Sequence, residues 1–460
     1  MTNIFEQGLK KFRKTHPAAL LLFSFVLTIG AGTGILLTPY ATATGDIAFI
    51  DALFTATSAV CVTGLSVVDI GTYFTLFGQW TILVLIQIGG LGLMTISVTI
   101  FHLIGKRVSF TQRKAMQETF AHTPREDIYR LLKLILIFTG IAELCGTILL
   151  FVCWSREYPV GKALYLAVFH SVSAFCNAGF SLFKDNFMGY LDDPLLNLTI
   201  CALIVCGGIG FPVVYDIYQQ MFHRPEKRFR LSVQTKTVLI TTVALIISGM
   251  VLFLLLESDN TLKPFSTSAS LLAALFQSIT CRTAGFNTVD LANIGNATAA
   301  LMILLMFIGA SPGSCGGGIK TTTFAVLGAF TWSRLRSNMR VNMFKRSIPR
   351  ASVSKSIAIV FLAISVIAVI FFLLLLSQQG KAIDAATGNE FRVYLFEVVS
   401  AFGTVGLSMG ATTAINSLGK ALIVSIMLIG RVGVLTFSYI IAGEELREGI
   451  EYAEENLMLG

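Results

Sequence analysis

Charged residues are scarce in this sequence. Only 13% of its 460 residues are Asp, Glu, Lys or Arg, whereas 54% are hydrophobic. So little charge excludes a soluble globular protein, and so much apolar side chain excludes a disordered one. Long uncharged runs instead predict an all-α polytopic membrane protein, because helices satisfy their own backbone hydrogen bonds in lipid.

Paired cysteine motifs are also missing. The eight cysteines lie in or beside apolar segments and form no C-x-x-C pair, so we expect neither a zinc site nor a disulfide framework, and no covalent cofactor. The net charge of +8 would suit a nucleic-acid partner, but the basic residues cluster in short segments between apolar runs, as in proteins oriented in a bilayer. We therefore expect membrane lipid as a partner, and no nucleic acid.

Eight apolar runs are long enough to cross a membrane. The first run follows a short basic start, and its length exceeds the apolar core of a signal peptide, which is the competing interpretation. The eight runs cover residues 18–37, 80–103, 134–154, 195–215, 238–256, 299–330, 357–376 and 421–441.

Four shorter apolar pieces lie between alternate runs. They cover residues 50–60, 163–175, 270–280 and 391–402, and their length suits half-helices that enter the membrane and return. A triplet ending in glycine follows each piece. The triplets are Val62-Thr63-Gly64, Asn177-Ala178-Gly179, Thr283-Ala284-Gly285 and Thr404-Val405-Gly406.

A second set of glycines repeats in step with the triplets. Gly89, Gly207, Gly309 and Gly430 follow the triplet glycines by 24 to 28 residues. This regular spacing predicts four tandem span–half-helix–span units around a central pore. The units cover residues 18–103, 129–220, 235–332 and 353–442, with tails at 1–17 and 443–460.

The distribution of Lys and Arg predicts the orientation. Segments that join units are basic, whereas segments inside units have few basic residues, so the positive-inside rule places the joining segments and both termini in the cytoplasm. The half-helices then enter from outside. The joining segments contribute Lys106, Arg107, Arg113, Lys114, Arg125, Arg224, Lys227, Arg228, Arg230, Arg334, Arg336, Arg340, Lys345, Arg346 and Arg350.

The triplets have the chemistry of a cation filter. A half-helix that enters from outside directs its C-terminal carbonyl oxygens, the negative end of its dipole, at the membrane centre. The following glycine permits backbone conformations in which carbonyl oxygens replace the water shell of an ion. Because these oxygens carry no full charge, a monovalent cation is the expected cargo. Asp69, Asp185 and Asp290 follow shortly and would line an acidic outer vestibule or simply a solvated surface.

The sixth apolar run is interrupted at membrane depth by the stretch IGASPGSCGGGIKTTT, residues 308–323. It matches G-x-S-x-G without the strand that a hydrolase elbow needs, and Ile319 spoils the spacing of a phosphate-binding loop. A flexible kink in a packed helix is the plain alternative. We expect residues 309–318 to form a movable gate in an ion path. The predicted gate residues are Gly309, Ser311, Gly313, Ser314, Gly316, Gly317, Gly318 and Lys320.

These four triplets and the G-S-C-G-G-G-I-K-T-T-T loop resemble the Trk/Ktr/HKT superfamily of potassium transporters over nearly the whole chain. The first unit begins at residue 18, whereas Trk-type subunits usually carry two additional spans before it. In this respect the sequence resembles the Ktr type, a KtrB-like membrane subunit. The resemblance implies potassium uptake, often sodium-stimulated, by a homodimer in the bacterial cytoplasmic membrane. It also implies a cytoplasmic ring of nucleotide-binding regulatory subunits (KtrA-like). Pro312 and Cys315 stand where relatives commonly have small hydroxyl residues.

Charged residues inside the predicted spans are expensive and need an explanation. Arg431 lies midway through the last run, and the resemblance places it below the filter, as an electrostatic barrier or as a support for the loop's carbonyl groups. Arg282 precedes the third triplet. We expect it to point behind the filter and to support it by pairing with Glu397 of the fourth half-helix.

Two alternative classes remain. Glu143 and Lys320 would suit a proton relay in a secondary active symporter with broken helices, although such symporters usually show two-fold repeats. An intramembrane protease is the third class. It would need Ser311 and His170 to meet, and the sequence places them in different units.

Overall fold

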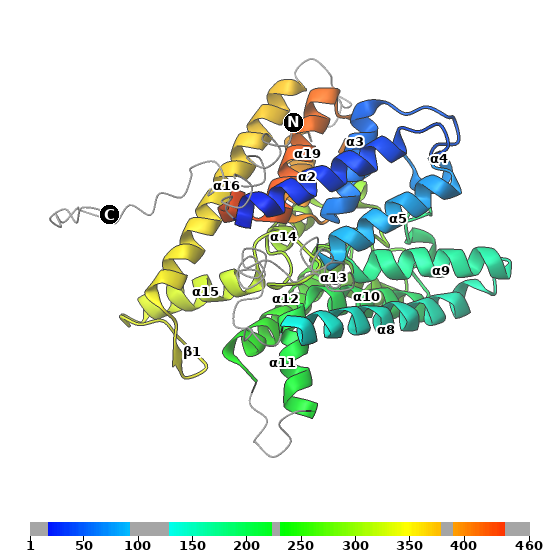
Figure 1. The fold of residues 1–460 in the computed structure, drawn as a ribbon. Coiled ribbons are helices and arrows are strands. Elements are labelled where there is room, and N and C mark those ends of the chain that lie inside the picture. The colour runs from blue at the N-terminus through cyan, green and yellow to red at the C-terminus, as the bar shows by residue number, and fades with distance from the viewer. Residues whose placement is uncertain (1–16, 93–127, 223–230, 379–389, 438–460) are drawn as a thin grey trace.

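The computed structural model describes residues 17–92, 128–222, 231–378 and 390–437. Within these ranges the chain is helical apart from one short hairpin (Figure 1). The predicted tails at 1–17 and 443–460 lie outside the described residues, except for Pro17. The basic residues of segments 93–127 and 223–230 lie outside them as well.

Each unit contains a first helix, a half-helix and a second helix. In the first unit these are α2 (Pro17–Leu36), α3 (Phe49–Cys61) and α5 (Leu76–Leu91), with the short α4 (Ile70–Tyr73) before α5. In the second unit they are α8 (Ile128–Trp154), α9 (Val160–Phe175) and α10 (Pro194–Gly208). The turn η1 (Met188–Tyr190) precedes α10, and α11 (Phe211–Phe222) follows it.

The third and fourth units repeat this order. The third has α12 (Val233–Glu257), α13 (Thr267–Thr280), η2 (Leu291–Asn293), α14 (Asn296–Phe307) and, after the glycine-rich loop, α15 (Thr321–Leu335). The fourth has α16 (Arg350–Ser377), α17 (Glu390–Gly403), α18 (Ala411–Ala414) and α19 (Ser417–Val432). The hairpin of β1 (Asn342–Met343) and β2 (Arg346–Ser347) joins α15 to α16.

The helices pack in a closed order. Within each unit the first helix contacts the half-helix: α2 with α3, α8 with α9, α12 with α13, and α16 with α17. Each second helix contacts the half-helix of the next unit: α5 with α9, α10 with α13, and α14 with α17. The second helix of the fourth unit, α19, contacts α3 of the first unit, so the helices form a circle.

Side-chain caps fix where the second helices begin. Thr75 Oγ1 accepts a hydrogen bond from the Gly78 N–H before α5, and Asn416 Oδ1 accepts one from the Gly419 N–H before α19. Asp193 caps α10, which has a proline as its first residue. These residue types satisfy N–H groups that have no partner within the helix.

The second helices end at a common point. Gly92, Gly210 and Gly433 each follow their repeat glycine by three residues, with φ angles of 84°, 96° and 96°. This left-handed backbone strongly favours glycine. It ends the helix, and after Gly210 the chain bends by 89° into α11. In the third unit Pro312 holds the same place, within the loop.

Eight continuous spans are therefore not confirmed. Among the described residues, α8, α12 and α16 are long and apolar enough to cross a membrane, and α10 with α11 makes a fourth if a bent pair counts as one span. The helices α5 and α19 are shorter because they end just before Gly92 and Gly433, and α14 is shorter because it ends at Phe307, where the loop begins. The rest of the predicted run 80–103 lies outside the described residues.

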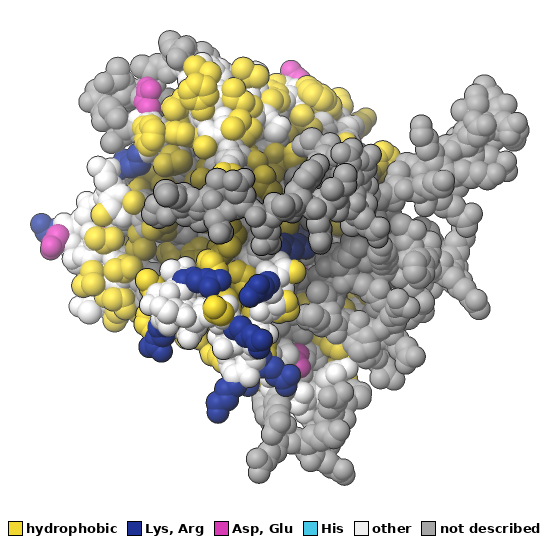
Figure 2. Space-filling model, turned by 90° about the vertical axis from the view of Figure 1, so that its left-hand side faces the viewer, with side chains coloured by type: hydrophobic (Ala, Val, Ile, Leu, Met, Phe, Trp, Pro, Cys, Tyr) yellow, Lys and Arg dark blue, Asp and Glu magenta, His cyan; other side chains and the backbone are white. Residues whose placement is uncertain are grey.

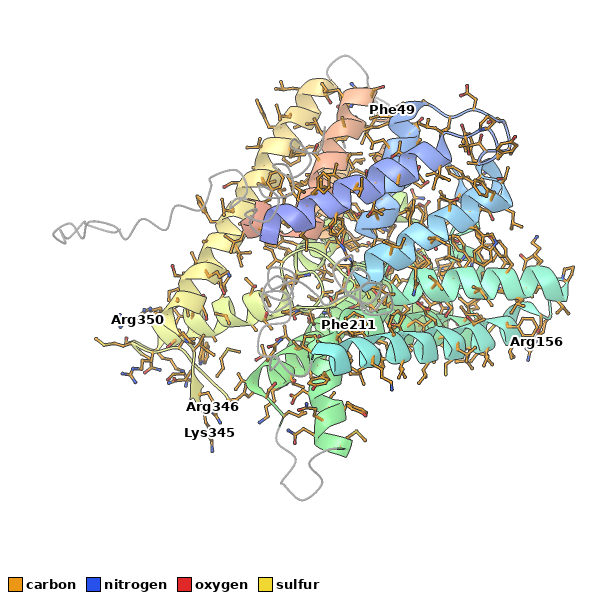
Figure 3. All side chains as sticks on the ribbon, in the orientation of Figure 1. Phe49, Arg156, Phe211, Lys345, Arg346 and Arg350 are labelled. Carbon is orange, nitrogen blue, oxygen red and sulfur yellow. The ribbon has the colours of Figure 1, made fainter. Side chains whose placement is uncertain are left out.

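The surface has one apolar and one basic region. Leu144, Leu255 and Phe361 are more than half exposed on α8, α12 and α16, as expected for helices that face lipid. Figure 2 shows Lys and Arg side chains gathered below a largely apolar face. Figure 3 places Lys345, Arg346 and Arg350 at the end of the molecule away from Arg156.

Candidate functional site

Four glycines meet where the half-helices end. A Cβ atom added to Gly64 would lie closer than 3.0 Å to the carbonyl oxygen of Ala178, in the next unit. The other three glycines make the same contact: Gly179 with Ala284 O, Gly285 with Val405 O, and Gly406 with Thr63 O. The last contact returns to the first unit, so the triplets form a closed ring of backbone.

The backbone of all four triplets is strained in the same way. The first residue of each has a positive φ, with values of 57° at Val62, 59° at Asn177, 71° at Thr283 and 50° at Thr404. Left-handed backbone is uncommon for any non-glycine residue and rare for the β-branched Val and Thr. Strain of this kind costs on the order of 1–3 kcal/mol per residue and persists where the surroundings impose it, often at functional sites.

Buried hydroxyl groups hold the ring from behind. Ser58 Oγ accepts a hydrogen bond of 3.1 Å from the Gly64 N–H, and Ser400 Oγ accepts one of the same length from the Gly406 N–H. In the other two units a hydroxyl group donates to the carbonyl oxygen after the glycine: Ser173 to Phe180 O at 2.8 Å, and Thr280 to Phe286 O at 2.6 Å. This role was missed from the sequence, although the serine six residues before the glycine recurs in three of the four units.

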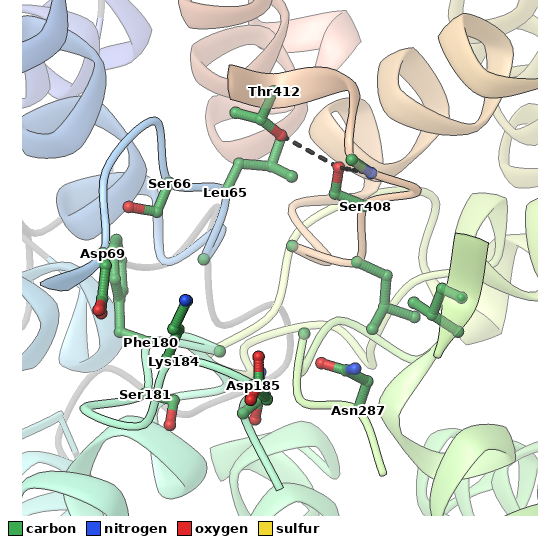
Figure 4. A pocket seen from close by; sticks show the side chains of 18 of the residues that line it. Leu65, Ser66, Asp69, Phe180, Ser181, Lys184, Asp185, Asn287, Ser408 and Thr412 are labelled. Carbon is green, nitrogen blue, oxygen red and sulfur yellow. Dashed lines mark hydrogen bonds between the residues drawn. The ribbon is translucent and has the colours of Figure 1, made fainter. Parts of the chain in front are cut away.

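A cavity of about 460 Å³ opens on one side of the ring. Its lining includes the four ring glycines and all three predicted vestibule aspartates, Asp69, Asp185 and Asp290. Figure 4 shows Asp69 and Asp185 at this cavity, together with Lys184. Asp69 and Asp290 also accept backbone hydrogen bonds at the starts of α4 and η2, so they stabilise the loop as well as line the cavity.

The loop 309–318 contacts the ring at its other end. The Gly317 N–H donates to Thr404 Oγ1 at 3.0 Å, and a Cβ on Gly316 would collide with Thr283 Oγ1. Thr404 and Thr283 begin their triplets, whereas the cavity borders the glycines that end them. The loop is further fixed to the second unit, since Cys315 N donates to Gly207 O at 3.1 Å.

Two partly buried cationic side chains bind carbonyl groups around the loop. Arg431 of α19 donates to the carbonyl oxygen of Cys315 in the loop and to that of Gly89 in α5. Lys320 Nζ donates to Gly316 O at 2.7 Å. These hydrogen bonds fix the loop to its surroundings. Its glycine-rich composition alone would indicate a more weakly packed segment.

The repeat glycines show how the third unit differs. Gly89, Gly207 and Gly430 each abut a carbonyl oxygen in the last turn of a half-helix, where a side chain would collide. Gly309 instead faces the carbonyl oxygen of Gly317 in its own loop. In the other three units this glycine lets the second helix pack against a half-helix. In the third unit it lets the two ends of the loop pack against each other.

The predicted pair of Arg282 and Glu397 is wrong. Glu397 Oε2 accepts from Ser408 Oγ at 2.7 Å, and Oε1 accepts from Thr412 Oγ1. Arg282 makes no ion pair with Glu397, and its Nε has no hydrogen-bond partner among the described residues. It follows the C-terminus of α13, where the negative end of the helix dipole lowers the cost of a buried cation.

The serine and histidine that the protease alternative would need do not meet. Ser311 Oγ accepts from Thr321 Oγ1 at 3.1 Å, whereas His170 Nε2 lies 3.2 Å from Ser181 Oγ. Neither hydrogen bond joins the two residues, so Ser311 is not activated by this histidine.

Comparison with known proteins shows the family. The model of the family TrkH, described as cation transport protein, matches residues 11–445. The chain is 40% identical to the Ktr system potassium uptake protein B of Vibrio alginolyticus, over 98% of this chain and 97% of that protein. It is 36% identical to the potassium/sodium uptake protein NtpJ of Enterococcus hirae, over 98% of this chain and 99% of that protein.

A solved structure shares the fold. The crystal structure of the potassium transporter TrkH from Vibrio parahaemolyticus matches 92% of this chain and 84% of its own, with a TM-score of 0.69 at 19% identity. The fold and the sequence relatives agree. The chain therefore belongs to the TrkH family of cation transport proteins, and it is a transporter rather than an enzyme.

Proposed function

We propose that this protein takes up potassium across the bacterial cytoplasmic membrane through a pore whose filter is the ring of Gly64, Gly179, Gly285 and Gly406. The observation that supports this most directly is the closed ring itself, in which each glycine faces a carbonyl group of the next unit. Curated relatives over the whole chain are named as potassium uptake proteins. A fourfold ring favours a pore over the symporter alternative, which usually has two-fold repeats.

The chemistry of the ring suits a monovalent cation. Backbone carbonyl oxygens can replace the water shell of potassium without placing a full negative charge at the filter. The aspartates of the outer cavity lie further out and raise the local concentration of cations. All four half-helices end beside the ring and direct the negative ends of their dipoles toward it. They are α3, α9, α13 and α17.

The loop 309–318 is the proposed gate, in its closed position. It lies on the side of the ring opposite the outer cavity, and Arg431 and Lys320 bind its carbonyl groups. Their positive charges would also oppose a cation leaving the filter. Movement of α14 and α15, which flank the loop, would break these hydrogen bonds and open the path.

Partners and sodium follow from the same assignment. The names of two relatives place them in a Ktr system, which has more than one component. We propose that this chain forms a homodimer controlled by a cytoplasmic ring of nucleotide-binding subunits (KtrA-like). The basic end at Arg346 and Arg350 is the proposed cytoplasmic face. The name of the Enterococcus relative includes sodium, which supports sodium as an activator of uptake.

Uptake by intact cells tests the proposal. The full chain is produced in bacteria that lack their own potassium uptake systems, and initial potassium and sodium uptake are measured with and without a Ktr-type regulatory subunit. We expect growth at low potassium and uptake that prefers potassium. A membrane-inserted, folded protein that supports neither would refute the proposed function.

A further inference from the structure

The four half-helices differ at one position that a ring of carbonyl groups does not explain. Nine residues before the ring glycines stand Thr55, His170, Phe276 and Glu397. Three of these are fully buried polar side chains, and two of the three, His170 and Glu397, are ionisable. The ring contacts run from unit one to two, three and four, so units two and four face each other across the ring.

Glu397 binds the loop that follows the filter in its own unit. Its two carboxylate oxygens accept hydrogen bonds from Ser408 and Thr412. Ser408 stands two residues after Gly406, and its hydroxyl oxygen accepts from the Gly410 N–H at 3.1 Å. Ser408 and Thr412 line the outer cavity, as Figure 4 shows, so the buried carboxylate holds the outer edge of the filter from behind.

His170 does the same in the opposite unit. Its Nε2 accepts a hydrogen bond of 3.2 Å from the Leu182 N–H and lies 3.2 Å from the hydroxyl oxygen of Ser181, which stands two residues after Gly179. Its Nδ1 lies 2.8 Å from Leu166 O, which makes Nδ1 the protonated nitrogen. The ring of Phe183 stacks on the imidazole at 5.0 Å and fixes its plane.

The other two units lack this connection. Thr55 Oγ1 donates to Asp51 O within its own helix, at 2.8 Å, and Phe276 has no polar group. The side chains two positions after their glycines bond within their own loops, Ser66 to Val68 O and Asn287 to Val289 O, while the Asn287 carbonyl accepts from the Phe187 N–H of the second unit. Among the described residues, the side chain nine positions before the glycine therefore binds the loop after the glycine in units two and four, and not in units one and three.

We propose that His170 and Glu397 are positioning residues that set the width of the filter along the diagonal between units two and four and thereby its preference for potassium over sodium. The inference rests on the proposed function of the ring. Closer to the ring, Ser400 binds the Gly406 N–H and Ser173 binds the carbonyl oxygen of Phe180, the residue after Gly179. The outer connections hold the backbone two residues later, so the carbonyl groups between them cannot close around a smaller ion.

A set of variants of the fourth unit separates positioning from folding. Glu397→Gln keeps hydrogen bonds to both hydroxyl groups, because an amide donates as well as accepts and a hydroxyl does both. Glu397→Leu with Ser408→Ala and Thr412→Val removes the connection without leaving an unpaired buried group, which is close to neutral for folding. We expect Glu397→Gln to keep the potassium preference. The triple variant should prefer potassium over sodium about tenfold less, because the free energy of one hydrogen bond to a charged group corresponds to about this factor.

The second unit and two controls complete the experiment. His170→Phe should also lower the preference for potassium over sodium. Thr55→Val alters the equivalent position of an unconnected unit. Glu257→Gln alters another buried carboxylate that binds Thr298 and the Gly295 N–H, away from the ring. Neither control should change the ratio of potassium to sodium uptake.

The readout is that uptake ratio, measured in cells with the full chain, beside the amount of folded protein after purification. A folded triple variant and a folded His170→Phe variant with unchanged preference would overturn the inference. Gly406→Ala distinguishes this from failure of the proposed function. If Gly406→Ala changes the preference and the triple variant does not, only the positioning role is wrong, whereas no change in either removes the filter assignment as well.

Discussion

The guanidinium group of Arg431 donates a hydrogen bond to the carbonyl oxygen of Cys315, 116 residues earlier in the chain. The same group also donates to Gly89 O, so one partly buried cation joins the loop of the third unit to the second helices of the fourth and first units. A carbonyl group bound in this way cannot also stabilise a passing cation. Under the proposed function, Arg431 would close the path both by holding the loop and by its charge.

Replacing Arg431 by Gln should open the gate in part. Each hydrogen bond from a charged group contributes about 1.5–3 kcal/mol, so we expect at least about tenfold more potassium flux in the absence of the regulatory partner. Selectivity should stay nearly the same, because the ring is not altered. The measurement is initial flux into liposomes that contain the purified protein.

Arg392 supplies the matched control for this substitution. Its guanidinium donates to Asn296 Oδ1 at 2.6 Å, near the start of α17 and therefore at the end of the half-helix away from the ring. Arg392→Gln should leave partner-independent flux at the level of the unmodified protein. Equal flux from both variants, or none gained with Arg431→Gln, would contradict the gating role.

Adding a methyl group at a ring glycine should weaken the preference for potassium over sodium. At Gly64, Gly179, Gly285 or Gly406 the new Cβ would meet the carbonyl oxygen of the next unit, and alanine at a positive φ adds strain on the order of 1–3 kcal/mol. Competition between potassium and sodium during uptake measures the change. Gly140→Ala in α8 is the control, because nothing lies within 4 Å of its added Cβ. Unchanged preference in all four variants would rule out the filter.

Local sequence signals predicted the half-helices and the ring. A short apolar piece followed by a glycine is readable from neighbouring residues, and Gly64 and its three counterparts do meet in space. The ends of the second helices were not readable. Gly92, Gly210 and Gly433 stand within or beside apolar runs, and only their positive φ angles show that the helix stops there.

Buried charges were the hardest feature to predict. An unpaired arginine and an unpaired glutamate in neighbouring units suggest a salt bridge, since a buried charge needs compensation. Hydroxyl groups of Ser408 and Thr412 compensate Glu397 instead, and a helix C-terminus lies beside Arg282. Such compensation depends on the fold and leaves no mark in the order of residues.

The absence of this salt bridge has a measurable consequence. Arg282→Met and Glu397→Leu should each lower the midpoint of thermal unfolding, because Glu397→Leu leaves the hydroxyl groups of Ser408 and Thr412 without their acceptor, and the double variant should show the sum of the two losses. Sites without a shared partner are additive to within about 0.5 kcal/mol. Recovery of stability in the double variant would restore the pairing that the sequence suggested.

Removing Gly316, Gly317 and Gly318 should shorten the loop and raise potassium flux sharply. Gly317 donates to Thr404 Oγ1, while Gly316 and Gly317 provide the carbonyl oxygens that Lys320 binds, so the deletion removes three contacts that hold the closed position. The loop ends at Ile308 and Ile319 are bridged to each other, which lets a shorter connection form without moving α14 or α15.

The deletion should also reduce dependence on the regulatory partner, since a partner has less left to move. Potassium preference should remain, because it is set at the ring. Lys320→Met, which removes the side chain's two hydrogen bonds but keeps the loop length, should change flux in the same direction by a smaller factor. Flux into liposomes is compared with and without partner, in potassium and in sodium. A folded deletion variant that is no faster, or one that loses selectivity and still depends on the partner, would show that this loop is not the gate.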